Sequence, residues 1–480
     1  MNNLNTTKKN YIYHTLYQVI TIITPLITTP YISRVLLSGG IGEYSYYYTN
    51  VQYFVIIGNL GFSTYGQIEI AKYQEDRLKR TKIFWEIFYS RLFVFAGTFL
   101  FYFIYFLLCQ NKMLVIILGL LLLSSAIDIC WLFFGMDNFK SVSMRNIYVK
   151  LGGIIGIFLF VKTKDDVWIY TLILSLTTLL GSIAMWKKLN HYVDRFSVKE
   201  CDLKQHYKPA IAFFLPNIAT SIYTMADRTM IGMITDSNEQ VGIYEEAHKI
   251  EQILIQFLLS VSVVYRSQMA RLFHENNVDK INDNIQSALK VILFFSFPMC
   301  FGLMAISEEL VLGFLGEGFI ESIPLLKIFA LLLVIISISN SMSNMFLIVT
   351  NKQDKFRRGI YIGASVNIIG NIILIPIIGA MGAAISSVIA EVVILVVFYY
   401  YSKDYYRFNQ CKKMFFTYFF TSILMMLVLV FVKRFLLVDL LLKLVVEILC
   451  GCIVYFGVLA IVKDKMIFSM IEYVKKKIGR

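Results

Sequence analysis

Long apolar runs separated by short polar segments divide the whole chain. An α-helix of about 20 mostly apolar residues is long enough to cross the hydrocarbon core of a bilayer. The runs predict spans near residues 11–34, 44–68, 83–109, 113–138, 145–162, 167–188, 209–235, 242–266, 287–306, 323–349, 358–378, 381–402, 412–434 and 437–462. The segments between them are too short for a folded soluble domain. The pattern therefore predicts an all-α polytopic membrane protein with about 14 transmembrane helices.

The first run, residues 11–34, is expected to be a membrane span. It is too long for a signal peptide, and no A-x-A cleavage site follows it. Composition favours the same class of protein, because the chain is 58% hydrophobic and only 16% charged, with a mean hydropathy of +0.66. Soluble domains are about 45–50% apolar and about 25% charged. A chain of this composition has too little polar material to cover a surface in water.

Basic residues alternate between the two sides of the predicted spans. With the N-terminus inside, the inner segments hold 34 Lys and Arg, whereas the outer segments hold six. Short cytoplasmic loops gather Lys and Arg, so the alternation supports the span count and predicts that both termini lie in the cytoplasm. The expected location is the plasma membrane. The net charge of +13 then reflects loops that face anionic lipid heads, and nucleic acid is not expected as a partner.

No cofactor or metal is expected. The seven cysteines form no CxxC pair and read as apolar packing residues, and the five histidines show no metal-ligand spacing. Nothing resembles a phosphate-binding P-loop, so ATP hydrolysis by this chain is not expected.

Several ionisable residues fall inside predicted spans. An ionised group near the bilayer centre costs about 2.5–3.5 kcal/mol on insertion scales, so each should face a cavity, a partner or the interface. The basic ones are Arg91, Arg228, Lys249, Lys327 and Lys443, with Arg34 at the outer end of the first span. Asp128, Asp227 and Glu245 are candidates for charge partners or for ion coupling. For Arg91, Lys327, Lys443 and Glu447, pairing or snorkelling to the interface is the simpler reading.

Polar residues recur at helical spacing in four spans, two in each half of the chain. Residues spaced by three and four lie on one face of a helix. The four sets are His14, Gln18, Thr21, Pro25 and Thr28; Ser45, Thr49, Gln52, Asn59 and Ser63; Asn217, Ser221, Thr224 and Arg228; and Glu245, Lys249, Gln252, Gln256 and Ser260. A single stripe often joins two helices. Four stripes together predict a water-filled cavity lined by the first, second, seventh and eighth spans.

Arg34, Arg228 and Lys249 would make that cavity cationic, offset by Asp227 and Glu245. Arginine offers a planar fork to phosphate oxygens, and lysine a compact point charge. The simplest ligand for such a cavity is an anion such as phosphate or pyrophosphate.

The chain also shows an internal repeat. Ile41-Gly42-Glu43-Tyr44 opens the second span of one half, and Val241-Gly242-Ile243-Tyr244 stands at the equivalent place in the other. Parallel repeats are one transporter architecture, with the site at the repeat interface. We expect an N-terminal lobe over residues 1–200, a second lobe over 201–405, and an added helix pair with a basic tail over 406–480.

Several short motifs together resemble Wzx-type polysaccharide flippases of the multidrug/oligosaccharidyl-lipid/polysaccharide (MOP) superfamily. The resemblance covers roughly residues 10–400 and one departure from it is Leu37-Ser38, where family members often have a Gly-Pro-like turn. The motifs are Tyr31-Ile32-Ser33-Arg34-Val35-Leu36, Gly42-Glu43-Tyr44-Ser45, Leu60-Gly61-Phe62-Ser63-Thr64-Tyr65-Gly66, Asp128-Ile129-Cys130-Trp131 with Phe139-Lys140, Asp227-Arg228 with Gly242-Ile243-Tyr244, and Leu374-Ile375-Pro376 with Gly379-Ala380-Met381-Gly382-Ala383-Ala384.

The resemblance implies a MATE-like V-shaped pair of six-helix lobes around a cationic cavity. It implies export of undecaprenyl-pyrophosphate-linked oligosaccharide repeat units for capsule, O-antigen or exopolysaccharide by alternating access, with a polysaccharide polymerase and glycosyltransferases as possible partners. Under this hypothesis the pyrophosphate is held by Arg34, Arg228 and Lys249, with Arg91 and Lys327 as further candidates. Sugar hydroxyls are contacted by Gln18, Gln52, Asn59, Asn217, Gln252 and Gln256.

Two alternatives stay open from the residues alone. A drug or metabolite antiporter of the same superfamily would want an acidic, aromatic site, which Asp128 or Asp227 could supply. A membrane polymerase or ligase would usually carry a sizeable outer loop with functional basic residues or His. The longest outer loop here, Ser307–Ser322, contains no Lys, Arg or His. An enzyme is therefore not expected.

Overall fold

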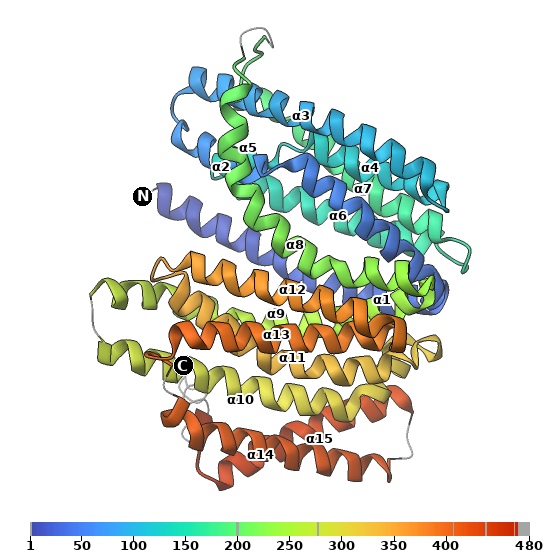
Figure 1. Cartoon of the computed structure of the whole chain (residues 1–480), viewed down its shortest axis with the longest axis vertical. Coiled ribbons are helices and arrows are strands. Elements are labelled where there is room, and N and C mark those ends of the chain that lie inside the picture. The colour runs from blue at the N-terminus through green and yellow to red at the C-terminus, as the bar shows by residue number, and fades with distance from the viewer. Residues whose placement is uncertain are drawn as a thin grey trace. The chain divides into compact units, whose positions relative to one another are not determined.

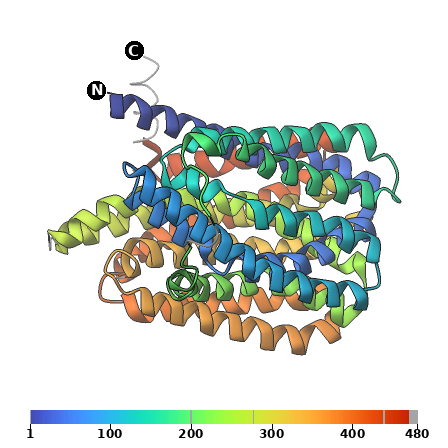
Figure 2. The ribbon, with the colours of Figure 1, turned by 90° about the horizontal axis from the view of Figure 1, so that it is seen from above.

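The computed structural model describes residues 2–197, 201–275, 278–406, 408–436, 439–464 and 466–468. Over these ranges the chain forms fifteen α-helices, joined by short turns and brief 3₁₀ and π segments, and no strand. The expected all-α polytopic class is confirmed. In two views at right angles, the long helices of each compact unit run roughly parallel or antiparallel to one another (Figures 1 and 2).

Twelve helical segments in the described part of the chain are long and apolar enough to cross a membrane. One of them, Leu16–Lys72, holds the first two expected spans, and α8 (Tyr207–Thr235), which holds the seventh, is not among the twelve. The expected number of about fourteen is reached when the first two spans are counted separately and α8 is included.

The first two expected spans meet at a kink inside α1 (Asn2–Asn59). Leu37 has φ 58° and ψ −179°, so two helical arms join at this residue. That region of backbone conformation is essentially reserved for glycine and costs a side-chain-bearing residue about 1–3 kcal/mol. Leu37 is also the position at which the sequence departs from the Gly-Pro-like turn, so the turn is kept although the glycine is not.

The chain divides into two compact units, Met1–Gly242 and Ile243–Arg480. In unit 1, α4 packs on α7, α1 packs on α4 and α6, and α8 contacts α1 and α2. The helices of this unit are α1, α2 (Phe62–Lys72), α3 (Arg77–Leu108), α4 (Lys112–Ile127), α5 (Cys130–Gly135), α6 (Phe139–Phe160), α7 (Val167–Trp186) and α8. The lobe boundaries expected from the repeat, at 200 and 405, stay a prediction.

Helix starts in unit 1 are fixed by side-chain caps. Asp76, Asn111 and Asn138 each accept a hydrogen bond from the backbone N–H three residues later, at the beginning of α3, α4 and α6. Such caps satisfy backbone donors that the first helical turn leaves without partners. They therefore set the boundaries between neighbouring spans.

The α4–α5 break divides the fourth expected span. An aromatic cluster that includes Phe62, Phe84 and Trp131 holds α5 against α2 and α3. Gly66 on α2 faces the Trp131 ring so closely that an added Cβ would lie 2.5 Å from it. The glycine of this motif thus lets α2 approach α5.

Unit 2 is built around α10, which packs on α11 and on the final helix pair, α14 and α15. Its helices α12 and α13 form a hairpin that turns at Gly379, where φ is 57°. The helices of this unit are most of α9 (Asn238–His274), then α10 (Val278–Leu310), α11 (Ser322–Met342), α12 (Gln353–Ile378), α13 (Ala380–Ser402), α14 (Phe408–Lys433) and α15 (Leu440–Ile461).

Candidate functional site

Arg34 lies one turn before the kink in α1. Its side chain is exposed, and its Nη1 donates a hydrogen bond to the carbonyl oxygen of Pro30 at 2.7 Å. The bond lies along its own helix and places the guanidinium at the end of the first arm. The guanidinium of Arg34 is therefore available to donate hydrogen bonds to a ligand.

The repeated glycine motifs contact one another inside unit 1. A Cβ added at Gly42 would collide with the carbonyl oxygen of Asn238, and one added at Gly242 would collide with the carbonyl oxygen of Ser38. Ser38 Oγ also lies 3.4 Å from Glu239 Oε1, to which it donates. The echo between the two motifs therefore marks a contact of backbone on backbone that only glycine permits at both positions.

A polar network joins α1, α3 and α8 next to Arg228. Thr229 Oγ1 donates to Asn50 Oδ1 at 3.1 Å, and Asn50 Nδ2 donates to Tyr105 OH at 3.2 Å. Arg228 is half-buried, whereas Asp227 is 7% exposed. Arg228 and Asp227 were predicted for the site from the sequence, whereas Asn50 was not, although an amide inside an apolar span is itself a signal.

The polar stripe on the second arm of α1 is partly used for packing. Asn59 Nδ2 donates to Ser125 Oγ of α4 at 3.1 Å, and Asn59 Oδ1 accepts from Ser63 Oγ at 3.2 Å. Gln52 is half-buried, and Gln18 on the first arm is exposed. Asn217 lies in α8, but its side chain falls outside the described part of the structure, as does that of His14.

Arg91 is completely enclosed in unit 1. Its Nη2 donates to the carbonyl oxygens of Ser125 and Ala126, at 3.0 and 2.9 Å, and to that of Asp128. These carbonyls stand at the C-terminal end of α4, where the helical hydrogen bonds stop. The guanidinium caps the end of α4, which favours a structural role for this residue.

Asp128 lies at the break between α4 and α5. Its Oδ1 is 3.7 Å from Arg145 Nη2, and the same Nη2 donates to Ser182 Oγ at 2.7 Å. Arg145, the first residue of the expected span 145–162, lies within α6. A carboxylate held by an arginine is a poor ligand for a cation, and this weakens the use of Asp128 for ion coupling.

In unit 2 the basic group of the α9 stripe has a close acidic neighbour. Lys249 Nζ lies 2.5 Å from Glu246 Oε1, and the Glu246 side chain is 1% exposed. Glu245, the acid singled out from the sequence, is half-buried one residue before it. The charge of Lys249 on the polar face of α9 is therefore partly neutralised by Glu246.

Further along α9, a second acid is buried. Glu251 is 0% exposed, and its Oε2 lies 3.3 Å from His248 Nδ1 and accepts from Gln252 Nε2 at 3.1 Å. Gln252 is half-buried, and Gln256 one turn later is exposed. The side chain at this end of the polar stripe is therefore accessible to a ligand.

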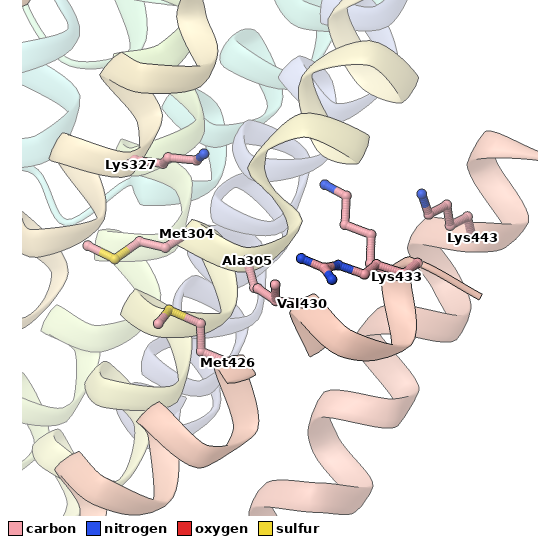
Figure 3. A pocket seen from close by; sticks show the side chains of 8 residues that line it. Met304, Ala305, Lys327, Met426, Val430, Lys433 and Lys443 are labelled. Atoms are coloured by element: carbon pink, nitrogen blue, oxygen red, sulfur yellow. The ribbon is translucent and has the colours of Figure 1, made fainter. Parts of the chain in front are cut away.

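Lys327 lies near the beginning of α11, is exposed, and lines a pocket with residues of α10, α14 and α15 (Figure 3). None of the residues lining this pocket belongs to α9. Among the described residues, no three His, Cys, Asp or Glu side chains gather in a way that could hold a metal ion.

The family model described as "Polysaccharide biosynthesis protein" matches residues 7–265, and the MatE model matches residues 212–377. A protein named "Putative O-antigen transporter" from Escherichia coli (strain K12) is 23% identical over 390 residues, which are 80% of this chain and 94% of that protein. A protein of the same name from Shigella dysenteriae is 26% identical over 282 residues, or 58% of this chain and 69% of that protein. Both relatives are named as transporters, not as enzymes.

Two solved structures share the fold. The lipid II flippase MurJ in an inward closed conformation has a TM-score of 0.71 and 18% identity, and the match covers 97% of this chain and all of MurJ. An inward-facing multidrug resistance MATE family transporter of the MOP superfamily has a TM-score of 0.59 and 15% identity, over 83% of this chain and 95% of that one. The expected MATE-like fold is confirmed.

Proposed function

Because this chain belongs to the family of polysaccharide biosynthesis proteins, as a Wzx-type member of the MOP superfamily, we propose that it flips lipid-linked oligosaccharides across the plasma membrane. The cargo would be a repeat unit carried on undecaprenyl pyrophosphate, moved from the cytoplasmic to the outer face. The glycosyltransferases that build the unit and the polymerase that consumes it would be the partners. The observation that carries the proposal is the match to an O-antigen transporter over 80% of the chain.

The proposed site is cationic. Arg34, at the bend of α1, and Arg228, beside the Asn50–Thr229 network, would bind the pyrophosphate as planar forks. Lys249 of unit 2, which is paired with Glu246, is the third candidate for binding the pyrophosphate. Gln18, Gln52, Gln252 and Gln256 are exposed or half-buried and would donate to sugar hydroxyls, with Asn217 as a further candidate.

Arg91, Lys327 and Asn59 are weaker candidates for the substrate. Arg91 and Asn59 are engaged with α4, and Lys327 faces a different pocket. Alternating access between the two lobes is the proposed mechanism. With an inside-negative potential, moving net negative charge outward is favourable by about 2.3 kcal/mol per charge per 100 mV.

Complementation of cells that lack their own polysaccharide flippase tests this function. Wild type should rescue surface polysaccharide, whereas Arg34→Ala and Arg228→Ala should each lower it at least tenfold at matched membrane levels. One hydrogen bond to a charged group contributes about 1.5–3 kcal/mol, and about 1.4 kcal/mol is a factor of ten. Arg195→Ala, in an exposed loop, is the matched control and should rescue fully. Rescue by both site variants would leave the flippase assignment standing and refute the cationic site.

A cation antiporter is the second candidate, favoured by the MatE match over residues 212–377. It would use Asp227 or Glu245 as the acidic group, because Asp128 is close to Arg145. If wild type fails to rescue a matched glycan and instead gives the cells resistance to cationic drugs, this reading replaces the first.

A further inference from the structure

Unit 2 contains a pocket of about 490 Å³ that lies apart from the α9 stripe. It lies where α10 ends, α11 begins, α14 ends and α15 begins, so it is at one end of the bundle. Figure 3 shows Lys327 of α11 and Lys433 of α14 pointing toward one another across it. In the topology expected from the loop charges, this end faces outside.

Four cationic side chains line the pocket: Lys327, Lys433, Arg434 and Lys443. Three carboxylates partly balance them: Glu308 and Glu309 of α10, and Glu447 of α15, which is 1% exposed and interacts electrostatically with Lys433 and Lys443. Glu309, whose side chain is 2% exposed, lies 2.9 Å from Lys433 Nζ and 3.0 Å from Lys443 Nζ, and Glu308 lies 2.7 Å from Lys433 Nζ. Within the described part of the chain, Lys327 and Arg434 form no ion pair, and the pocket therefore carries excess positive charge.

The ion pairs also fix the shape of the pocket. Glu309 comes from α10, Lys433 from α14 and Lys443 from α15, so a single buried carboxylate ties three helix ends together. A buried carboxylate held by two lysines is a rigid arrangement, since losing either partner leaves charge without compensation. Arg434, which follows Lys433 at the end of α14, is thus presented on a preformed wall, and Lys327 faces it from α11.

The remaining walls are apolar. Met304, Met426 and Val430 line the pocket below the cations (Figure 3). Beside it, the outer faces of α14 and α15 are apolar and uncovered, with Leu427 56%, Phe431 63% and Leu441 59% exposed. Since these helices cross the membrane, such faces meet acyl chains, and the cations stand at the depth of lipid headgroups.

We infer that this pocket binds the phosphate of an anionic phospholipid, with Lys327 and Arg434 as its main ligands and the first acyl carbons against the two methionines. Arginine suits the phosphate because its fork can donate two parallel hydrogen bonds, and lysine adds a point charge. Basic pockets between membrane helices bind lipid head groups in this way. A free phosphate would use the same cations but not the apolar walls. The inference does not depend on the transported substrate.

The test uses the purified full-length protein in neutral detergent. Thermal unfolding and native mass spectrometry would compare phosphatidylglycerol, phosphatidylcholine and inorganic phosphate. Phosphatidylglycerol should raise the unfolding temperature and be retained with one copy in this pocket. Lys327→Gln and Arg434→Gln should each weaken the apparent affinity about fivefold, because one charge near a membrane surface contributes about that factor.

Two kinds of control make the result decisive. Lys112→Gln removes an exposed lysine from unit 1, at the end expected to face the same side, and should leave lipid binding unchanged. Lys327→Arg keeps the charge and should bind within about twofold of wild type, even if a glutamine variant folds poorly. Arg434→Lys keeps the charge but loses the planar fork, so its affinity should fall between those of wild type and Arg434→Gln. Unchanged binding in both glutamine variants would overturn the site. Equal stabilisation by inorganic phosphate, with no lipid retained, would overturn the lipid as its ligand.

Discussion

Two glycines in unit 1 determine how closely two backbone segments can approach each other. Gly42 and Gly242 lie where segments 38–42 and 238–242 contact each other. Neither position has room for a Cβ atom. Gly39, three residues before Gly42, has nothing within 4 Å of the place that an added methyl group would take, and its φ lies outside the left-handed region. Substitutions at Gly39 and Gly42 can therefore distinguish the effect of steric crowding from the general effect of replacing a helical glycine.

We predict that Gly42→Ala destabilises unit 1 and Gly39→Ala does not. An added methyl at position 42 must push two segments apart, which costs about 1–3 kcal/mol in a well-packed site. At position 39 the same change should be neutral or stabilising by up to about 1 kcal/mol. Thermal unfolding of both variants in one detergent measures the difference. Equal unfolding temperatures would mean that the two segments are free to separate.

Ionisable residues show how far sequence reasoning reaches. Hydropathy marked many of the charges within the spans, but Glu86 in the expected span 83–109, which is 1% exposed, was not singled out. Hydropathy did not select partners, since Lys249 has acids both three and four residues before it and a helix brings either within reach. That Arg91 binds three carbonyls was also not foreseen, because Asp128 was taken as a charge partner inside one span and not as the end of a helix.

At the scale of elements, the segment after α7 is fastened to the beginning of α3. Asp194 accepts from Arg77 Nε at 2.8 Å and from Arg77 Nη2 at 2.7 Å, and its backbone oxygen accepts from Trp85 Nε1 at 2.8 Å. Its backbone N–H donates to Thr81 Oγ1 at 3.1 Å. The hydrogen bonds from Arg77 lower the pKa of the Asp194 carboxyl below its ordinary value.

The contact between Asp194 and Arg77 should weaken only at acidic pH. Because the pKa of Asp194 is lower in the folded chain than in the unfolded one, the contact contributes fully above the ordinary Asp value of about 3.9 and is lost as the pH falls through the folded pKa. Hydrogen exchange of residues 192–197, corrected for intrinsic rates, should stay constant from about pH 8 to 5 and rise below about pH 4. Asp194→Asn should exchange faster at about pH 6 and lose the acid step, whereas an unchanged step would assign it to another group.

Helix positions were largely predictable, but helix continuity was not. The expected span 11–34 falls on the first arm of α1, and 44–68 covers the second arm and continues past the break at Leu60 and Gly61 into α2, since apolar length specifies a span directly. The expected span 113–138 proved to be α4 and α5 with a break at Asp128. The lining of the outer pocket was also not foreseen, because it unites four helix ends far apart in sequence.

At the scale of the whole molecule, the charge pattern and the fold support one another. The likeness to MurJ covers 97% of the chain, and fourteen spans, the predicted even number, would bring both termini to the same side of the membrane. Fold likeness gives no direction in the membrane. Direction comes from the loops, where Lys and Arg number 34 on one side and six on the other.

We therefore predict a specific labelling pattern for single cysteines in intact cells, with the seven natural cysteines replaced. Lys164→Cys and Glu317→Cys should react with a membrane-impermeant maleimide, because both lie in exposed outer loops, one in each unit. Lys79→Cys and Lys352→Cys, exposed on the other side, should react only after the cells are opened. The opposite result in unit 2, with Lys352→Cys labelled and Glu317→Cys protected in intact cells while unit 1 behaves as expected, would contradict the topology. It would mean that the chain crosses the membrane an odd number of times between Lys164 and Glu317. Inversion of all four would reverse the protein, and the cationic pocket of unit 2 would then face the inner leaflet, where anionic lipid is also present to bind it.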